Sequence, residues 1–236
     1  RRVSLSSIRA PRLGNKNRED QPFAYEAREF LRSKIVGKKC SVNIEYIVTP
    51  PADAVGLAAQ VRKYGTVIVT LRKRRANVAV LVLEEGLATL MTHKAGSTER
   101  SEHYHNLMEA RNTAESKKIG LHSPSANKNA SRHIMDLNTP ALAKSYLSNL
   151  QQAKSLKAIV EYIHNGARMK VFVPGHSCLL SFALSGIQCP STARTELKGE
   201  GGKVIRQATA GEPYAKEALL FTRALVLQKE VEIVIE

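Results

Sequence analysis

The sequence predicts an α+β fold, mainly small β-barrels with packed helices, arranged as two tandem units. Three observations support this prediction. The 236 residues are 43% hydrophobic, enough to bury two modest cores, and the usual domain size favours two units over one. Apolar residues follow helical spacing in some stretches and strand spacing in others. The stretch 22–45 also recurs at 213–236.

This internal repeat aligns without a gap, at a constant offset of 191 residues, as between Glu26 and Glu217. Each copy is expected to form an amphipathic helix followed by a strand, because apolar residues at helical spacing precede β-branched ones. Pro22 and Pro213 are expected in the first helical turn, where Pro loses no needed hydrogen bond.

A second pair of matching segments lies upstream of each copy. Ile8 to Pro11 corresponds to Ile187 to Pro190 at an offset of 179, so the following loop is 12 residues longer in the second copy. That loop, 191–211, is rich in Gly, Lys and Thr and is expected to be flexible.

Other elements of the first half follow from apolar spacing and from glycines at helix ends. They are a loop near 49–59, a strand at 64–71, a basic loop at 72–75, a helix at 77–85 ended by Gly86, a strand at 87–91 and a helix at 101–118 ended by Gly120. Small polar residues at 123–129 predict a linker, which gives domains at 1–126 and 127–236.

The second half is expected to place three strands before its copy of the repeat. Residues 139–150 have helical spacing, and strands follow at 157–162, 168–173 and 179–187. His164, Asn165 and Gly166 join the first two strands, and Asn-Gly is a strong hairpin signal. The predicted order of strand, strand, strand, helix and strand fits a small barrel.

The formal charge of +15, from 36 Lys and Arg against 21 Asp and Glu, makes nucleic acid the leading partner class. A basic surface that aids solubility or binds an acidic protein is the alternative.

The three cysteines form no CxxC pair, which is typical of reduced thiols in an intracellular protein. No run of about 18 apolar residues occurs, so no membrane span is expected.

Six motifs together resemble the nuclease-like repeats of Tudor staphylococcal nuclease proteins. They are Leu5 to Arg12 (LSSIRAPR), Tyr25 to Arg32 (YEAREFLR), Glu85 to Thr89 (EGLAT), His103-Tyr104, Gly120 to Ser123 (GLHS) and Gly186 to Pro190 (GIQCP). The resemblance implies two staphylococcal-nuclease-like OB-fold domains in tandem, both incomplete. Residues 1–126 lack the opening hairpin, and residues 127–236 lack the C-terminal strands and helices. Unpaired strand edges would then favour self-association.

The resemblance also implies where a nuclease site would lie. Catalytic relatives place an Arg five residues before the Asp of an Asp-Thr-Pro-Glu motif, add metal-binding carboxylates, and have a later Arg before Gln-Gly-Leu-Ala. Other residues stand at these positions: Ser4, Arg9 and Arg12 in the first copy, Ala183, Gln188 and Ser191 in the second, and Glu84 at the later arginine. The turn Asn165-Gly166-Ala167 also lacks a carboxylate, so no catalytic or metal-binding residue is predicted.

Histidines and cysteines offer no clear alternative chemistry. His103 and His105 face different sides of the predicted helix, and His122, His133, His164 and His176 are isolated in sequence. Cys178 and Cys189 lack a partner at a spacing typical of an activated nucleophile.

Basic residues predict phosphate contacts in both halves. The candidates are Arg62, Lys63, Arg72, Lys73, Arg74, Arg75, Arg168 and Lys170. The loop 72–75 would otherwise be a solvated hairpin tip or an ion-pairing loop. Because aromatic residues make up only 5% of the chain, recognition of the backbone of double-stranded or structured RNA is favoured over sequence-specific recognition.

The resemblance implies an RNA-binding scaffold that acts in RNA silencing, including RISC, in RNA decay or in transcriptional co-activation. Protein partners in ribonucleoprotein complexes are expected, in the cytoplasm with the nucleus as a second compartment. A calcium-dependent ribonuclease acting on structured or double-stranded RNA and a protein-interaction module are the alternatives. No cofactor is expected, apart from calcium under the ribonuclease alternative.

Overall fold

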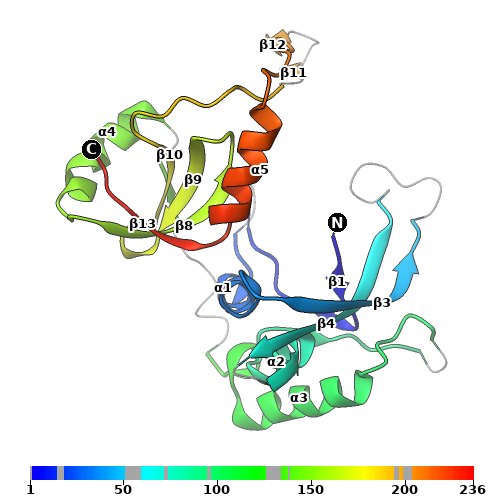
Figure 1. Cartoon of the computed structure of the whole chain (residues 1–236). Helices are drawn as coiled ribbons and strands as arrows, with labels where there is room; N and C mark the ends of the chain where they lie inside the picture. The colour runs from blue at the N-terminus through cyan, green and yellow to red at the C-terminus, as the bar shows by residue number, and fades with distance from the viewer. Residues whose placement is uncertain are drawn as a thin grey trace. The chain divides into compact units, whose positions relative to one another are not determined.

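The computed structural model describes residues 2–14, 19–50, 60–71, 74–94, 97–125, 134–137, 139–193, 197–198 and 204–236. The chain divides into two compact units, Arg1–Arg132 and His133–Glu236, each with its own hydrophobic core (Figure 1). The expected boundary between 126 and 127 lies outside the described residues and stays a prediction.

The first unit packs three helices with a small sheet. Its elements are β1 (Ser4–Leu5), β2 (Ile8–Arg9), α1 (Ala24–Ile35), β3 (Cys40–Val48), β4 (Arg62–Leu71), β5 (Arg74–Asn77), α2 (Val78–Glu84), β6 (Thr89–Leu90), α3 (Tyr104–Lys117) and a 3-10 turn, η2 (Gly120–His122). The sheet has the order β1-β4-β3, with β5 paired to β4, while β2 pairs with β6. The helix α2 lies between α3 and β4 (Figure 1).

The sequence explains why α2 is the centre of this core. Asn77 caps it, because its Oδ1 accepts a hydrogen bond from the Ala79 N–H at 2.9 Å. The helix consists of apolar residues up to Glu84, and Val82 and Leu83 are fully buried. The predicted helix at 77–85 is therefore confirmed to within a residue at each end.

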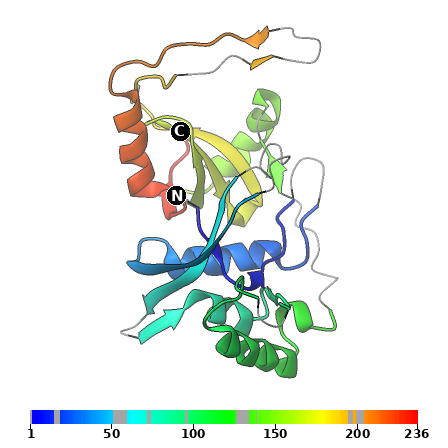
Figure 2. The same ribbon diagram turned by 90° about the vertical axis from the view of Figure 1, so that its right-hand side faces the viewer.

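The second unit contains an open five-stranded sheet with the order β13-β8-β9-β10-β7. Its elements are β7 (Met135–Asp136), α4 (Pro140–Gln151), β8 (Leu156–Ile163), β9 (Arg168–Val173), a 3-10 turn η4 (Pro174–His176), β10 (Cys178–Ala183), β11 (Leu197–Lys198), β12 (Val204–Arg206), α5 (Ala215–Val226) and β13 (Glu230–Ile233). Strands β8, β9 and β10 lie side by side, with α5 next to β8 (Figure 2). The predicted order is confirmed, although no sheet closes into a barrel within the described residues.

Several local predictions were wrong. Pro22 and Pro213 precede their helices instead of entering the first turn, because Phe23 and Tyr214 adopt left-handed conformations (φ 60° and 62°) just before the helices begin. The strand expected at 179–187 ends at Ala183. The described part of the loop at 191–211 includes the antiparallel pair β11–β12, and its flexibility stays a prediction.

The internal repeat is confirmed as a structural repeat. In both copies a left-handed residue begins a helix that ends shortly before a strand, and the two helices cover equivalent positions. Within the described residues, no helix is both long enough and apolar enough to span a bilayer.

Candidate nucleic-acid interface

A groove of about 1090 Å³ opens on the second unit at one end of strands β8, β9 and β10. Its lining residues come from three stretches, Tyr162 to Met169, Ser181 to Leu184, and Ile187 to Thr192. Among the described residues, neither Asp nor Glu belongs to this lining, whereas Arg168 and His164 do. Glu212 lies next to the lining, because its Oε2 accepts a hydrogen bond from the Ser191 N–H at 2.7 Å. The described lining therefore presents hydroxyl, amide, aromatic and cationic groups, together with apolar side chains such as Met169 and Ile187.

The groove gathers residues that the sequence had marked separately. Ala183, Gln188 and Ser191, the three degenerate motif positions of the second copy, line it together with Arg168. The segments 183–191 and 164–168 meet because β9 and β10 are antiparallel, with Arg168 opposite Ala183. The motif positions of the second copy thus lie together on one continuous surface.

The turn between β8 and β9 is held rigidly at the edge of the groove. Asn165 Oδ1 accepts hydrogen bonds from the backbone N–H of Ala167 (3.0 Å) and of Arg168 (2.7 Å). From α5, the Thr222 hydroxyl donates to the Gly166 carbonyl at 2.8 Å. These bonds confirm the predicted hairpin and fix the backbone that carries His164 and Arg168.

Gly166 has no side chain because the fold leaves no room for one. A Cβ atom at this position would lie 2.7 Å from Cys189 Sγ and 3.1 Å from the Ala218 Cβ. Gly166 is not among the glycines with positive φ. Close packing, and not the backbone conformation, therefore requires a glycine at this position. A side chain at position 166 would have to displace Cys189 or α5.

Strand register places Tyr162, Lys170 and Ser181 in one row across the sheet. A β-bulge between Val160 and Tyr162 shifts the register of β8, so Tyr162 pairs with Lys170 and points away from the core. Arg168 lies two residues from Lys170 on β9, hence on the same face. Of the two basic candidates of this unit, Lys170 therefore lies opposite the exposed Tyr162, and Arg168 lies diagonally across from it.

The two cations of this face differ in availability. Lys170 Nζ forms an ion pair with Asp136 Oδ2 at 3.3 Å, and its side chain is only 24% exposed. Arg168 is exposed and forms no ion pair within the described part of the chain. Arg168 is accordingly the stronger candidate for a phosphate contact.

In the first unit, the predicted basic residues do not form one cluster. Arg62 and Lys63 begin β4, whereas Arg74 and Arg75 lie in β5, where Arg75 pairs with Thr70 near the other end of β4. Eight residues of extended strand separate Arg62 from Thr70, about 26 Å at the usual rise. Arg72 and Lys73 lie outside the described residues. The predicted loop at 72–75 is thus partly strand.

The degenerate positions of the first unit follow one another along the chain. Ser4 in β1 pairs with Tyr64, Arg9 belongs to β2, and Arg12 lies beyond it; all three are exposed. Glu84 is the exposed last residue of α2.

Beside Ser4, the sheet of the first unit carries a tyrosine pair and a carboxylate that sequence reasoning missed. The rings of Tyr46 and Tyr64 stack at 4.9 Å, and burial raises the pKa of Tyr46. Glu45 Oε1 accepts hydrogen bonds from the hydroxyls of Thr66 (2.8 Å) and Ser101 (3.2 Å). A carboxylate here opposes phosphate binding, which favours the groove of the second unit as the nucleic-acid site.

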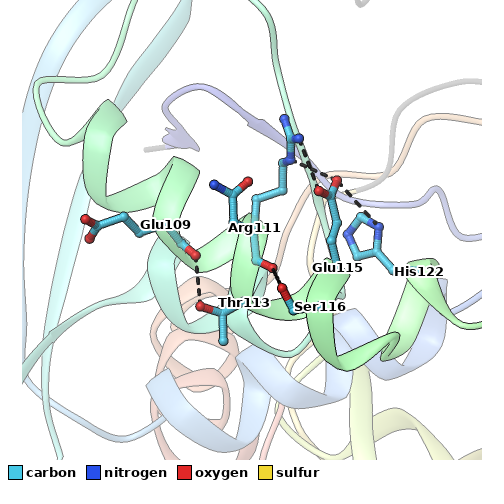
Figure 3. Close-up of polar contacts among 7 residues, drawn as sticks. Glu109, Arg111, Thr113, Glu115, Ser116 and His122 are labelled. Atoms are coloured by element: carbon cyan, nitrogen blue, oxygen red, sulfur yellow. Dashed lines mark hydrogen bonds and ion pairs between the residues drawn. The ribbon is translucent and has the colours of Figure 1, made fainter.

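Two histidines of the first unit, His105 and His122, lie beside glutamates of α3. Figure 3 shows Glu115 of α3 between Arg111, whose Nε lies 2.9 Å from Glu115 Oε1, and His122, whose Nδ1 lies 3.9 Å from the same oxygen. His105 pairs with Glu109 one turn earlier on α3, at 3.2 Å. Within the described residues, no three His, Cys, Asp or Glu side chains are grouped so that they could hold a metal ion.

The cysteines differ in their surroundings. Cys178 is fully buried, and burial raises the pKa of its thiol, which keeps it neutral and protected from reagents. Cys40 and Cys189 are half-buried and free. His133 lies outside the described residues.

Residues 2–124 match the family model described as staphylococcal nuclease homologue. Over the whole chain, the sequence is 36% identical to Ribonuclease TUDOR 2 of Arabidopsis thaliana, of which it covers 24%. It is 34% identical to Staphylococcal nuclease domain-containing protein 1 of Drosophila melanogaster, over 97% of the chain and 23% of that protein. The protein of the same name from Schizosaccharomyces pombe is 33% identical over 98% of the chain and 24% of its own length. The chain thus spans about a quarter of the length of the curated relatives it matches.

Proposed function

The chain belongs to the family of staphylococcal nuclease homologues, and from this membership we propose that it is an RNA-binding module whose nuclease sites are degenerate. Its similarity to Tudor staphylococcal nuclease proteins extends over nearly all of its residues. The proposed ligand is structured or double-stranded RNA, bound mainly through its phosphate backbone.

The observation that carries this proposal is the chemistry of the groove in the second unit. Metal-assisted cleavage of a phosphodiester needs oxygen ligands for the metal and cations for the developing charge. Within the described residues, the groove lining contains no carboxylate, and the adjacent Glu212 carboxylate is already bound by the Ser191 N–H. The turn that would carry a metal ligand has no room for a side chain at Gly166. Arg168 remains as a cation for a phosphate. These features support binding over hydrolysis at this position.

The charge distribution supports the same proposal. With a formal charge of +15, the chain attracts polyanions, and each neutralised phosphate makes the affinity more sensitive to salt. Arg62 and Lys63 at one end of β4, and Arg74 and Arg75 near the other, provide further phosphate contacts in the first unit. Their separation suits a backbone that is followed over several nucleotides.

The wider role that we propose is that of a scaffold in ribonucleoprotein complexes. Such a module would act with protein partners in RNA silencing, RNA decay or transcriptional co-activation, in the cytoplasm and also in the nucleus. Family membership supports these roles only as a class, because the chain covers a quarter of its relatives. A calcium-dependent ribonuclease is the second candidate, favoured by the name of the Arabidopsis relative.

The test is fluorescence anisotropy with labelled double-stranded and single-stranded RNA, from about 50 to 200 mM salt, with and without calcium. We expect salt-dependent binding of uncut RNA. Arg168→Glu, and Arg62→Glu combined with Lys63→Glu, should each weaken binding and reduce the slope of log affinity against log salt by about one unit per lost contact. Lys144→Glu, an exposed charge reversal on α4, is the matched control.

A gel of the recovered RNA separates the candidate functions. Cleavage that requires calcium and survives purification would establish the ribonuclease instead of the scaffold. Absence of binding at low salt would leave the protein-interaction module as the remaining function. Equal losses in Lys144→Glu and Arg168→Glu would show that only net charge matters.

A further inference from the structure

We propose that the groove of the second unit is a stacking site for one unpaired RNA base, with Tyr162 holding the base and Arg168 holding a neighbouring phosphate. This inference rests on the RNA-binding function proposed above and adds a ligand class to it. Backbone contacts alone would not distinguish single-stranded from double-stranded RNA, whereas a stacking site accepts only a base that has left its pair.

Tyr162 is exposed although most residues of β8 are buried. The flanking residues Val160 and Ile163 are 0% and 3% exposed, while Tyr162 is 56% exposed. The β-bulge at Glu161 causes this difference, because the extra residue lets Val160 and Ile163 both face the core and turns Tyr162 outward. Bulges of this kind are frequent next to binding sites, where they redirect a side chain.

A neighbouring histidine orients the tyrosine ring. The His164 and Tyr162 ring centroids are 4.9 Å apart, and the planes meet at 71° in an edge-to-face contact. Such a contact restricts ring motion before any ligand arrives, so less conformational entropy is lost when a base stacks. His164 itself belongs to the turn that Asn165 and Thr222 hold in place.

A cation lies diagonally across from Tyr162 on the neighbouring strand. Tyr162 pairs with Lys170, and Arg168 precedes Lys170 by two residues, about 6.6 Å along β9. Tyr162 and Arg168 both line the groove, and Arg168 has no ion-pair partner within the described residues. A base on the tyrosine ring would therefore bring its own or the next phosphate towards the guanidinium.

The polar side chains in the rest of the lining suit a nucleotide. Ser181, Gln188, Ser191 and Thr192 supply hydroxyl and amide groups for base edges and for the ribose 2′-hydroxyl. The groove lies at one end of β8, β9 and β10 and includes the turn between β8 and β9. OB-folds bind oligonucleotides on the corresponding strands and turn.

The experiment compares short unstructured single-stranded RNA with a blunt RNA duplex, using the whole chain and anisotropy at fixed low salt. Stacking on an aromatic side chain contributes about 1–3 kcal/mol per base, so Tyr162→Ala should weaken single-strand binding about 5- to 150-fold. Duplex affinity should stay unchanged, and Tyr162→Phe should keep both affinities. Tyr214→Ala, which removes a 78% exposed tyrosine from the same unit, is the matched control.

A second readout reports the stacking directly. The chain contains no tryptophan, so Tyr162→Trp introduces a single indole as a fluorescent reporter. Its emission should be quenched when single-stranded RNA is added, but not when the duplex is added. Circular dichroism of each variant verifies that the fold is retained.

Three results would overturn the inference. If Tyr162→Ala binds single-stranded RNA as tightly as the unsubstituted chain, no base stacks there, although salt-dependent binding would still support the RNA-binding module. If Tyr162→Ala and Tyr214→Ala weaken the binding of single-stranded RNA equally, the loss is general and does not report a stacking site at Tyr162. If the unsubstituted chain binds no RNA at low salt, both proposals fail together.

Discussion

Gly86 and Gly120 allow the ends of α2 and α3 to meet by direct backbone contact. Both have positive φ (65° and 56°), and Gly86 accepts a hydrogen bond from the Leu121 N–H at 2.8 Å. A Cβ on Gly86 would lie 2.4 Å from the Ile119 carbonyl oxygen, and one on Gly120 would lie 2.3 Å from the Gly86 carbonyl oxygen. The sequence indicated two helix ends, and the structure shows that they fit together.

The predicted consequence is that Gly86→Ala is far more damaging than an alanine at another glycine of positive φ. Gly37 has φ 76°, but a methyl group there would meet nothing within 4 Å. Gly37→Ala should therefore lower the free energy of unfolding only by the cost of placing alanine in a left-handed conformation, about 1–2 kcal/mol. Gly86→Ala adds a backbone clash, and we expect about 3 kcal/mol or more. Urea denaturation measures both, and equal losses would contradict the close-contact explanation.

Among the secondary-structure elements, the two copies of the repeat share a fold but differ in surroundings. In α1, Ala27 is buried and Phe30 packs against the core formed with α2 and β4. In α5, the residue equivalent to Phe30 is Phe221, which is 67% exposed. The same local pattern therefore makes the same helix, while neighbouring elements decide which side chains are buried.

This difference predicts opposite outcomes for matched substitutions. Phe30→Ala removes a core contact and should lower the free energy of unfolding of the first unit by about 3 kcal/mol. Phe221→Ala removes an exposed ring and should change that of the second unit by no more than about 0.5 kcal/mol. Thermal or urea unfolding tests the pair. A large loss from Phe221→Ala would mean that another surface covers α5 in solution.

Across the molecule as a whole, the two units have separate hydrophobic cores. Leu83 is fully buried in the core of the first unit, and Leu156 is 7% exposed in that of the second. Two cores that share no residue should lose stability independently.

Native-state hydrogen exchange tests this independence. Leu83→Ala should lower the protection of amides in the first unit by about 2–5 kcal/mol and leave the second unit unchanged. Leu156→Ala should produce the reverse pattern. If either substitution lowers protection throughout the chain, the units unfold as one.

Residue type and spacing along the chain were enough to predict the local features of this protein. They predicted the helix and strand of each repeat, the helix that starts near Asn77, the hairpin at Asn165 and the α+β class, because turn preference and apolar period are local properties. The missing carboxylates of the motif positions and the positive charge are likewise visible without coordinates.

Which of these residues meet depends on tertiary packing. The fold separates Arg62 from Arg75 along β4, pairs Lys170 with Asp136, and turns Tyr162 outward through a bulge. It also brings Gly166 against Cys189, 23 positions later in the chain. Strand register and packing across distant segments set these relations, and no local pattern records them, because a shift of one residue in pairing moves a side chain to the opposite face.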